Sequence, residues 1–227
     1  GLSAEIVARR GYDSVTFDLQ HGAASLADVP RLLQAVSGTP AVPLVRVPRN
    51  DGAMIMRALD MGAEGVIVPM VETATEARDA VAAALYPPAG RRSYGPLRAG
   101  LAYGPDQHVR ANDAVAVFAM VETALGLENL TSIAQTVGLT GLYVGPADLS
   151  YAVGAPPTSD SRDPRQVAAV ERILAACKAH DKVAGIHTGS VAFAREAAGR
   201  GFTFITVAID YAVLGQEAGA RLDAFRS

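Results

Sequence analysis

Cysteine, lysine and long apolar runs are scarce in this chain, and each scarcity removes a class of protein. The single cysteine, Cys177, excludes an internal disulfide and a cysteine metal cluster. Because Cys177 lies in an alanine-rich helical pattern, we interpret it as a small buried thiol and not as a nucleophile. The longest apolar runs are too short to cross a bilayer and are interrupted by Gly and Pro. No signal peptide opens the chain, so we expect no membrane partner, and a cytoplasmic location fits.

An excess of positive charge is also lacking. The formal net charge is −3 and the pI is ≈ 5.8, so no basic surface is expected for a phosphate backbone. Nucleic acid is therefore a disfavoured partner. What the chain does have is length and apolar content: 227 residues, 50% of them hydrophobic and 19% charged. That is enough for one sizeable core, and we expect a single domain over residues 1–227.

Short runs rich in Val, Ile and Leu alternate with longer amphipathic segments along the whole chain. We expect strands at Ser14–Asp18, Ala41–Val47, Gly65–Met70, Ala114–Val121, Gly141–Gly145, Lys182–His187 and Phe202–Ile209. The runs are mostly continuous and do not alternate strictly with polar residues. This pattern is typical of a parallel sheet that is covered on both faces.

Helix-capping patterns mark the segments between these strands. The expected caps are Ser25 with Asp28, Asn50 or Asp51, Thr73 with Glu76, Asp163 before Pro164, and Ser190. A last helix is expected at about Tyr211–Phe225. Two long loops, Tyr86–Asp113 and Leu149–Arg162, are expected to be functional, because loops of that length inside a compact domain usually are.

The order of elements is seven strand–helix repeats, preceded by a lone helix at about Leu2–Arg10. This order favours a (β/α)8 TIM barrel whose first strand is missing before Gly1. An open doubly wound sheet is the alternative. It would normally carry a Gly-rich phosphate-binding turn after an early strand, and the sequence has none.

Polar residues gather where the expected strands end. They are Asp18 and His21, Arg46, Glu122, Asp148, His187 and Asp210. In a barrel these ends converge on one mouth, where the active site lies. Buried charges are costly unless they are paired or bound to metal. The alternative is that each residue only caps a helix or forms a salt bridge at the rim.

Glu122 and Asp148 end neighbouring expected strands, so their carboxylates can approach one another. Two such anions would repel unless a cation lay between them. Two carboxylates, with substrate oxygens and waters, make the hard ligand shell that Mg²⁺ or Mn²⁺ prefers. The sequence therefore predicts a divalent-metal site, in which Co²⁺ or Ni²⁺ could substitute.

His21 is the candidate acid/base, because its ordinary pKa lies near the working pH. A purely structural histidine is the competing interpretation, although Gly22 beside it allows close approach of a substrate. Arg46 offers a planar, permanently charged fork for a carboxylate or an enolate. A salt bridge with Asp18 is its simpler interpretation, and both can hold. Asp60 lies near the end of a helix, where an acidic residue is unfavourable, which hints at a purpose.

The only lysines, Lys178 and Lys182, lie in and just after an expected helix, away from the mouth. This placement argues against a Schiff-base mechanism, which needs an amine at the site. His187 sits at a strand end but has no obvious partner in the sequence.

Several short strings in the sequence are similar to those of a known enzyme family. The chain resembles the HpcH/HpaI aldolases, which include 4-hydroxy-2-oxoheptanedioate aldolase and 2-dehydro-3-deoxyglucarate aldolase. The matching strings span nearly the whole chain. They are Gly11–Asp13, Asp18–Gly22, Pro43–Val47, Leu59–Ala63, Val68–Val71, Tyr86–Ser93, Met120–Thr123 and Gly145–Ser150.

The resemblance implies a metal-dependent class II aldolase that uses pyruvate and an aldehyde. Glu122 and Asp148 look like the metal ligands, His21 like the base, Asp60 like the partner of His21, and Arg46 like the stabiliser of the transition state. Ala147 and Asp148 look like contacts for the pyruvate carboxylate. The resemblance also implies a homo-oligomer, a hexamer built from dimers that exchange their last helix.

Two positions depart from the family pattern. Gln20 stands where the family often has Glu, and Met120 stands where the family has a substrate-contacting Gln. The second change removes a polar contact from the substrate-binding position and puts donor orientation in doubt.

The sequence leaves three points open. Arg91, Ser93 and Arg98 either touch the aldehyde acceptor or belong to a solvated loop. A lyase acting on a CoA thioester is an alternative activity, with Arg91, Arg92 and Arg98 available for the CoA phosphates. A degenerate, non-catalytic barrel is the other alternative.

Overall fold

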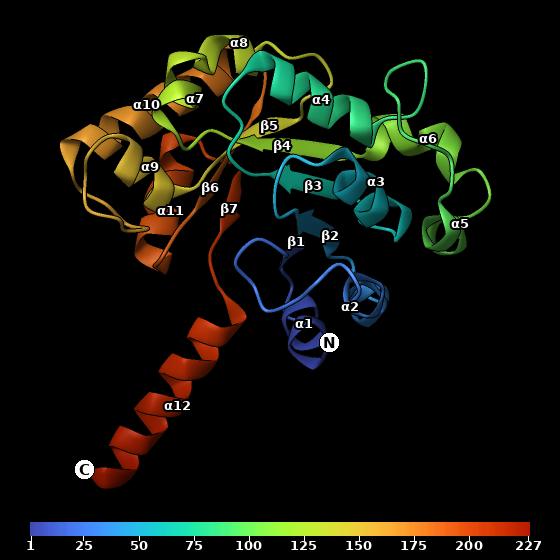
Figure 1. The fold of residues 1–227 in the computed structure, drawn as a ribbon. Helices are drawn as coiled ribbons and strands as arrows, with labels where there is room; N and C mark the ends of the chain where they lie inside the picture. Colours follow the sequence, from blue (N-terminus) through green and yellow to red (C-terminus); the bar gives the residue numbers. More distant parts are fainter.

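A computed structural model describes all residues from Gly1 to Ser227. Its seven strands form one parallel sheet in chain order, and each strand pairs only with its neighbours in sequence (Figure 1). The strands are β1 (Ser14–Asp18), β2 (Val42–Arg46), β3 (Gly65–Val68), β4 (Ala116–Met120), β5 (Gly141–Val144), β6 (Val183–His187) and β7 (Phe204–Thr206). Because β1 and β7 are unpaired edges, the sheet is an open half-barrel, consistent with a TIM-like fold.

Twelve helices accompany the sheet. They are α1 (Leu2–Ala8), α2 (Val29–Val36), α3 (Gly52–Asp60), α4 (Ala74–Ala84), α5 (Leu97–Tyr103), α6 (Gln107–Ala114), α7 (Ala124–Glu128), α8 (Leu130–Ala134), α9 (Pro146–Ala152), α10 (Pro164–Ala179), α11 (Val191–Arg200) and α12 (Asp210–Arg226). None of them is long and apolar enough to cross a membrane.

The sheet separates two apolar clusters, because alternate side chains of a strand point to opposite faces. The larger cluster has 44 buried residues and fills the space between the sheet and the helices outside it. The smaller cluster lies on the inner face of the half-barrel and consists of Ile67, Phe118, Met120 and Tyr143. Since both faces are apolar, the strands carry the continuous hydrophobic runs that the sequence shows.

The expected caps are largely confirmed. Thr73 and Glu76 form a complete capping box at α4, and Asp51, not Asn50, caps α3. Asp163 accepts from Arg165 at the start of α10, and Ser190 accepts from Phe193 at α11. The Ser25 prediction was wrong in detail, because Asp28 is the N-cap residue of α2 and its carboxylate accepts from Ser25.

The two long loops are partly helical, which corrects the sequence prediction. Residues 86–113 contain α5 and most of α6, and residues 149–162 contain the end of α9. These helices are short and lie between glycines and prolines, such as Pro96 and Gly104 around α5. A seven-residue helix spans too few turns to show a clear apolar stripe in sequence.

Helix α12 projects away from the rest of the chain (Figure 1). It has no buried residue along its whole length. Its large apolar side chains are exposed, including Leu214 at 72% and Phe225 at 88%. A helix that exposes several large apolar side chains to water is unusual for an isolated monomer.

Candidate active site

Asp18 and Arg46 are joined at the ends of β1 and β2. Arg46 Nε donates to Asp18 Oδ1 at 2.8 Å, and Arg46 Nη2 donates to Asp18 Oδ2. Burial alone would raise the pKa of the Asp18 carboxyl, but the hydrogen bonds and charge of Arg46 outweigh burial and lower that pKa. The expected salt bridge is therefore confirmed, and it fixes the direction of the guanidinium.

The segment after β1 folds back onto Asp18. The backbone N–H groups of Gln20 and His21 donate to Asp18 Oδ1 at 3.0 and 3.3 Å. A Cβ on Gly22 would lie 2.2 Å from the Asp18 carbonyl oxygen, so only glycine fits there. The turn thus presents the exposed imidazole of His21 beside the Asp18–Arg46 pair, with no hydrogen bond to restrain it.

Glu122, two residues beyond β4, is almost fully buried at 1% exposure. Its Oε1 accepts the backbone N–H of Met70 at 3.0 Å, while its Oε2 is buried without a hydrogen-bond partner. A Cβ on Gly145 would lie 1.9 Å from this Oε2. The end of β5 therefore leaves room for the carboxylate only because residue 145 is glycine.

Burial raises the pKa of Glu122 to about 7, and the negative charge of Asp148 adds to the rise. The Met70 N–H and the Arg46 charge act in the opposite direction. Asp148 and Ala147 lie in the first turn of α9, where both are exposed. The structure thus brings Asp148 and Arg46 each within electrostatic reach of Glu122.

Met120 belongs to the inner apolar cluster and is 1% exposed. A Cβ on Gly145 would meet the terminal methyl of Met120 at 2.7 Å as well as the Glu122 carboxylate. An apolar thioether at this position gives a bound ligand no strong hydrogen bond. The substrate contact at Met120 stays a prediction, and the buried thioether would contribute shape to it and no strong hydrogen bond.

Asp60 lies at the other end of the sheet from His21. It is the last residue of α3, which leads into the start of β3, whereas His21 follows the end of β1. One strand length, on the order of 15 Å, separates two such ends. Within one chain Asp60 instead pairs with the buried Arg92, which donates to Oδ1 from Nε at 3.2 Å and from Nη2 at 2.7 Å.

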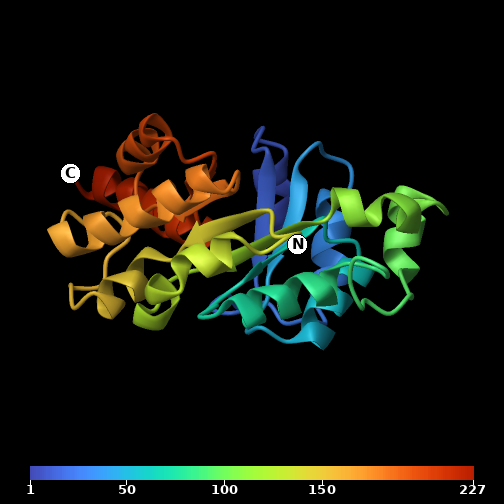
Figure 2. The same cartoon turned by 90° about the horizontal axis from the view of Figure 1, so that it is seen from above.

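The candidate acceptor residues lie at that same far end. Helices α5 and α6 precede β4, and in Figures 1 and 2 they stand on the side from which β3 and β4 start. Arg98 donates to the Met61 carbonyl at 2.8 Å, and Arg91 forms a surface ion pair with Asp79. Ser93 is exposed. None of the three lies at the mouth of its own chain.

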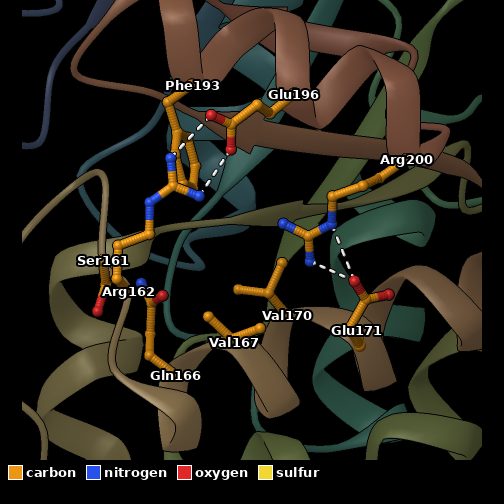
Figure 3. Close-up of a pocket in the computed structure, with 9 residues that line it drawn as sticks. All are labelled: Ser161, Arg162, Gln166, Val167, Val170, Glu171, Phe193, Glu196 and Arg200. Atoms are coloured by element: carbon orange, nitrogen blue, oxygen red, sulfur yellow. Dashed lines mark hydrogen bonds and ion pairs between the residues drawn. The ribbon is translucent and has the colours of Figure 1, made fainter.

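One hollow away from this site is lined by paired charges. A cavity of about 220 Å³ lies between α10 and α11 (Figure 3). Its two arginines are already paired, Arg162 with Glu196 and Arg200 with Glu171. Because both guanidinium groups are already bound to carboxylates, this cavity offers a ligand no free charged group.

Three contributors to the site have no clear signal in the sequence. The Met70 N–H is a backbone donor to Glu122. Met70 has a left-handed φ of 55°, which residues other than glycine rarely adopt. Gly145 matters for the side chain it lacks. Arg92 binds Asp60 across 32 positions of chain. All three stand in strings that carry the family resemblance, Val68–Val71, Tyr86–Ser93 and Gly145–Ser150, but nothing in those strings predicts these contacts.

Comparison with known proteins agrees with this geometry. A family model described as HpcH/HpaI aldolase/citrate lyase matches residues 2–216. The chain belongs to this family. It is 39% identical to the hydroxypyruvate/pyruvate aldolase of Rhizorhabdus wittichii, over 96% of this chain and 86% of that protein. It is 38% identical to the 4-hydroxy-2-oxo-heptane-1,7-dioate aldolase of Salmonella arizonae, over 96% and 83%.

The fold gives the same relationship. A crystal structure of an HpcH/HpaI aldolase/citrate lyase family protein from Burkholderia cenocepacia superposes with a TM-score of 0.92. The two chains are 35% identical, and the match covers 100% of this chain and 90% of that one. The protein is thus a carbon–carbon lyase of the HpcH/HpaI family, and the expected resemblance is confirmed.

Proposed function

We propose that this protein catalyses reversible aldol cleavage of 4-hydroxy-2-oxo acids, with a divalent metal, pyruvate or a close 2-oxo acid as nucleophile, and an aldehyde as acceptor. One observation carries the proposal. The buried Glu122 Oε2 has no partner in the chain and lies at the strand ends near Asp148 and Arg46. A buried carboxylate oxygen that is left unpaired is costly, and a cation there would remove the cost.

The donor set fits a hard cation. Glu122 and Asp148 would hold the ion, and no third His, Cys, Asp or Glu gathers with them. Two carboxylates leave coordination positions for water and for substrate oxygens, which is the shell of Mg²⁺ or Mn²⁺ more than of structural zinc. When bound, such a cation supplies a Lewis acid that acidifies the C3 protons of a 2-oxo acid.

The residues of the chain supply the remaining chemistry. Arg46, fixed by Asp18, directs its guanidinium into the mouth, where it stabilises negative charge on the C2 oxygen of the substrate. His21 removes a proton from C3, or returns it in the cleavage direction, because its imidazole is exposed and free of hydrogen bonds. The first turn of α9 offers the backbone of Ala147 and Asp148 to the substrate carboxylate.

The test is exchange of the C3 protons of pyruvate with deuterium, followed by NMR. Chelation with EDTA should abolish exchange, and Mg²⁺ or Mn²⁺ should restore it. Full exchange in EDTA would contradict the metal role. Failure to exchange under every metal condition would contradict the proposed nucleophile. A screen of 4-hydroxy-2-oxo acids for cleavage then identifies the aldehyde.

The CoA-thioester alternative gains no support from the arginines that motivated it. Arg92 is buried against Asp60, and Arg98 is bound to the Met61 carbonyl. Both lie at the end of the sheet remote from Glu122. A non-catalytic barrel is disfavoured by the unpaired Glu122 oxygen, which packing alone does not explain.

The proposal extends to a homo-oligomer in which α12 packs on another copy, with a hexamer as the assembly that the family suggests. Exposed Leu214 and Phe225 on a helix without buried residues support it. Asp60 supports it too, because Arg92 donates only to Oδ1 and leaves Oδ2 free. A pair between His21 and Asp60 would then form between copies. The closed eight-stranded barrel and the cytoplasmic location stay predictions.

A further inference from the structure

His187 is the last residue of β6 and lies on the inner face of the sheet. Val183 packs against the inner apolar cluster. A Cβ on Gly185 would meet Tyr143 at 2.7 Å and Phe204 at 3.1 Å, which are also inner-face residues. Since side chains repeat their direction every two residues, His187 points to the same face, one step closer to the mouth.

The backbone around His187 is held from two sides. His187 is in register with Thr206 on β7. Thr188 donates to the Thr206 carbonyl from its backbone N at 3.1 Å and from Oγ1 at 2.9 Å. Gly189 N donates to Asp160 Oδ1 at 2.7 Å. The imidazole itself makes no hydrogen bond within the chain. Its ring nitrogens are therefore free to bind a ligand.

The backbone of His187 lies level with the junction that holds the Glu122 carboxylate, and the charges of Arg46 and Asp18 at the strand ends act on its imidazole. Val144 is in register with Ile186, which places Gly145 level with His187 on the adjacent strand. Gly145 puts no side chain there, and the Glu122 Oε2 fills the position where its Cβ would be. Nothing on β5 therefore separates β6 from the carboxylate.

The other polar groups on this inner face are already engaged. Tyr143 and Thr206 share a hydrogen bond of 2.6 Å between their hydroxyls, and Arg46 is bound to Asp18. Burial lowers the pKa of His187, and the Arg46 charge lowers it further, against Asp160 and Asp18. A neutral imidazole carries one donor and one acceptor nitrogen, which suits a hydroxyl group.

We propose that His187 is a specificity-determining residue that hydrogen-bonds a hydroxyl group of the substrate. It favours a hydroxylated 2-oxo acid, or a hydroxylated aldehyde, over the counterpart without that hydroxyl. The inference rests on the proposed aldolase function, and it adds a selectivity which that function does not require. Sites built to bind a hydroxyl discriminate against analogues that lack it, because the site's polar group is then left unpaired.

The test compares four substrate pairs in the wild-type enzyme, His187→Leu and His187→Gln. The nucleophiles are pyruvate and hydroxypyruvate, and the aldehydes are propanal and glyceraldehyde. His187→Leu should lower kcat/KM about tenfold for the pair that carries the recognised hydroxyl, with pairs lacking it changed by less than about twofold. His187→Gln should recover part of the loss, because its amide donates and accepts. His180→Leu, at the end of α10, is the matched control.

Each arm has a distinct meaning. A loss that follows hydroxypyruvate places the hydroxyl on the nucleophile, and a loss that follows glyceraldehyde places it on the acceptor. An equal loss for all four pairs, or no loss, overturns the role of His187 while C3 exchange by the wild-type enzyme leaves the aldolase proposal standing. Absence of C3 exchange by the wild-type enzyme with Mg²⁺ and Mn²⁺ overturns both.

Discussion

At the scale of single residues, the side chains at the strand ends differ in the freedom that their neighbours leave them. Arg46 is fixed in two places by Asp18, whereas His21 is anchored only through its backbone. A fixed cation suits a stabilising role, and a mobile imidazole suits proton transfer. Pairing of Asp18 with Arg46 was predictable, because the two residues end adjacent parallel strands.

Other contacts of the site were not predictable at this scale. The Glu122 carboxylate is held by the backbone of Met70, and any residue type offers the same N–H. The family resemblance implied that Asp60 is the partner of His21. Within one chain, however, Asp60 accepts hydrogen bonds from Arg92. Sequence patterns locate a residue along a strand or helix, whereas these partners depend on how the elements pack.

Replacing Arg46 by Ala should reduce deuterium exchange at C3 of pyruvate by about 100-fold or more, the scale of losing one charge-stabilising donor. Lysine should recover only part of the activity, since it lacks the planar fork that meets Asp18 in two places. NMR gives the exchange rate and a thermal melt gives the folded state. Unchanged exchange in Arg46→Ala would remove the arginine from the mechanism.

Glu122 should make the metal-free protein less stable as pH rises. Burial raises its folded pKa to about 7 from the ordinary 4.5, so between these values the folded state binds more protons than the unfolded state. The free energy of unfolding should then fall by roughly 3 kcal/mol across this window and stay flat above it. Denaturant melts in EDTA at pH 5 and pH 8 measure the slope.

Glu122→Gln is the matched comparison for this effect, since it has nearly the same shape and does not titrate. The variant should lack the Glu122 contribution to the slope and should gain little stability from added Mg²⁺ at pH 8. The wild-type protein should gain most from Mg²⁺ at that pH, where the free carboxylate is charged. Equal slopes for the two proteins would show that the carboxyl titrates normally.

At the scale of elements, the strands were far more predictable than the short helices. All seven expected strands exist, and Ser14–Asp18 has the expected bounds. The expected strand Phe202–Ile209 shrinks to the three residues of β7, since only Phe204–Thr206 are in register with β6. Helices α5 and α6 were taken for loop, since neither buries a broad apolar face.

The junction between β5 and α9 sets the room for the metal ligand. Gly145→Ala would place a Cβ 1.9 Å from Glu122 Oε2, so the carboxylate must move. We expect stability to fall by about 1–3 kcal/mol and Mn²⁺ affinity to fall at least about tenfold. Calorimetric Mn²⁺ titration measures the affinity. Gly199→Ala in α11, which meets no atom within 4 Å, should leave binding unchanged.

At the scale of the whole molecule, the isolated chain leaves two kinds of surface uncovered. The sheet has free edges at β1 and β7, and α12 carries its apolar side chains into water. The sequence predicted the last helix within one residue at each end, but no sequence pattern states whether a helix packs on its own chain. Assembly is therefore the level that sequence patterns alone left undetermined.

Charge at two exposed apolar positions of α12 should disrupt assembly. The double variant Leu214→Asp with Phe225→Asp should elute as a smaller species than the wild-type protein, because an interface core tolerates charge poorly. Size-exclusion chromatography with light scattering gives the mass. Gln216→Asp, on the same helix, should assemble normally. A wild-type protein that is monomeric at all concentrations would contradict the proposal.

The position of Asp60 at the far end of the sheet has a genetic consequence. If each working centre takes His21 from one copy and Asp60 from another, two inactive variants should complement. His21→Ala and Asp60→Asn, each nearly inactive alone, should form mixed assemblies when they are co-expressed in equal amounts. Random mixing pairs an intact histidine with an intact aspartate in about a quarter of the centres. Activity would then belong to a pair of chains, and an allele defective at both residues would lower it by more than the loss of its own copies.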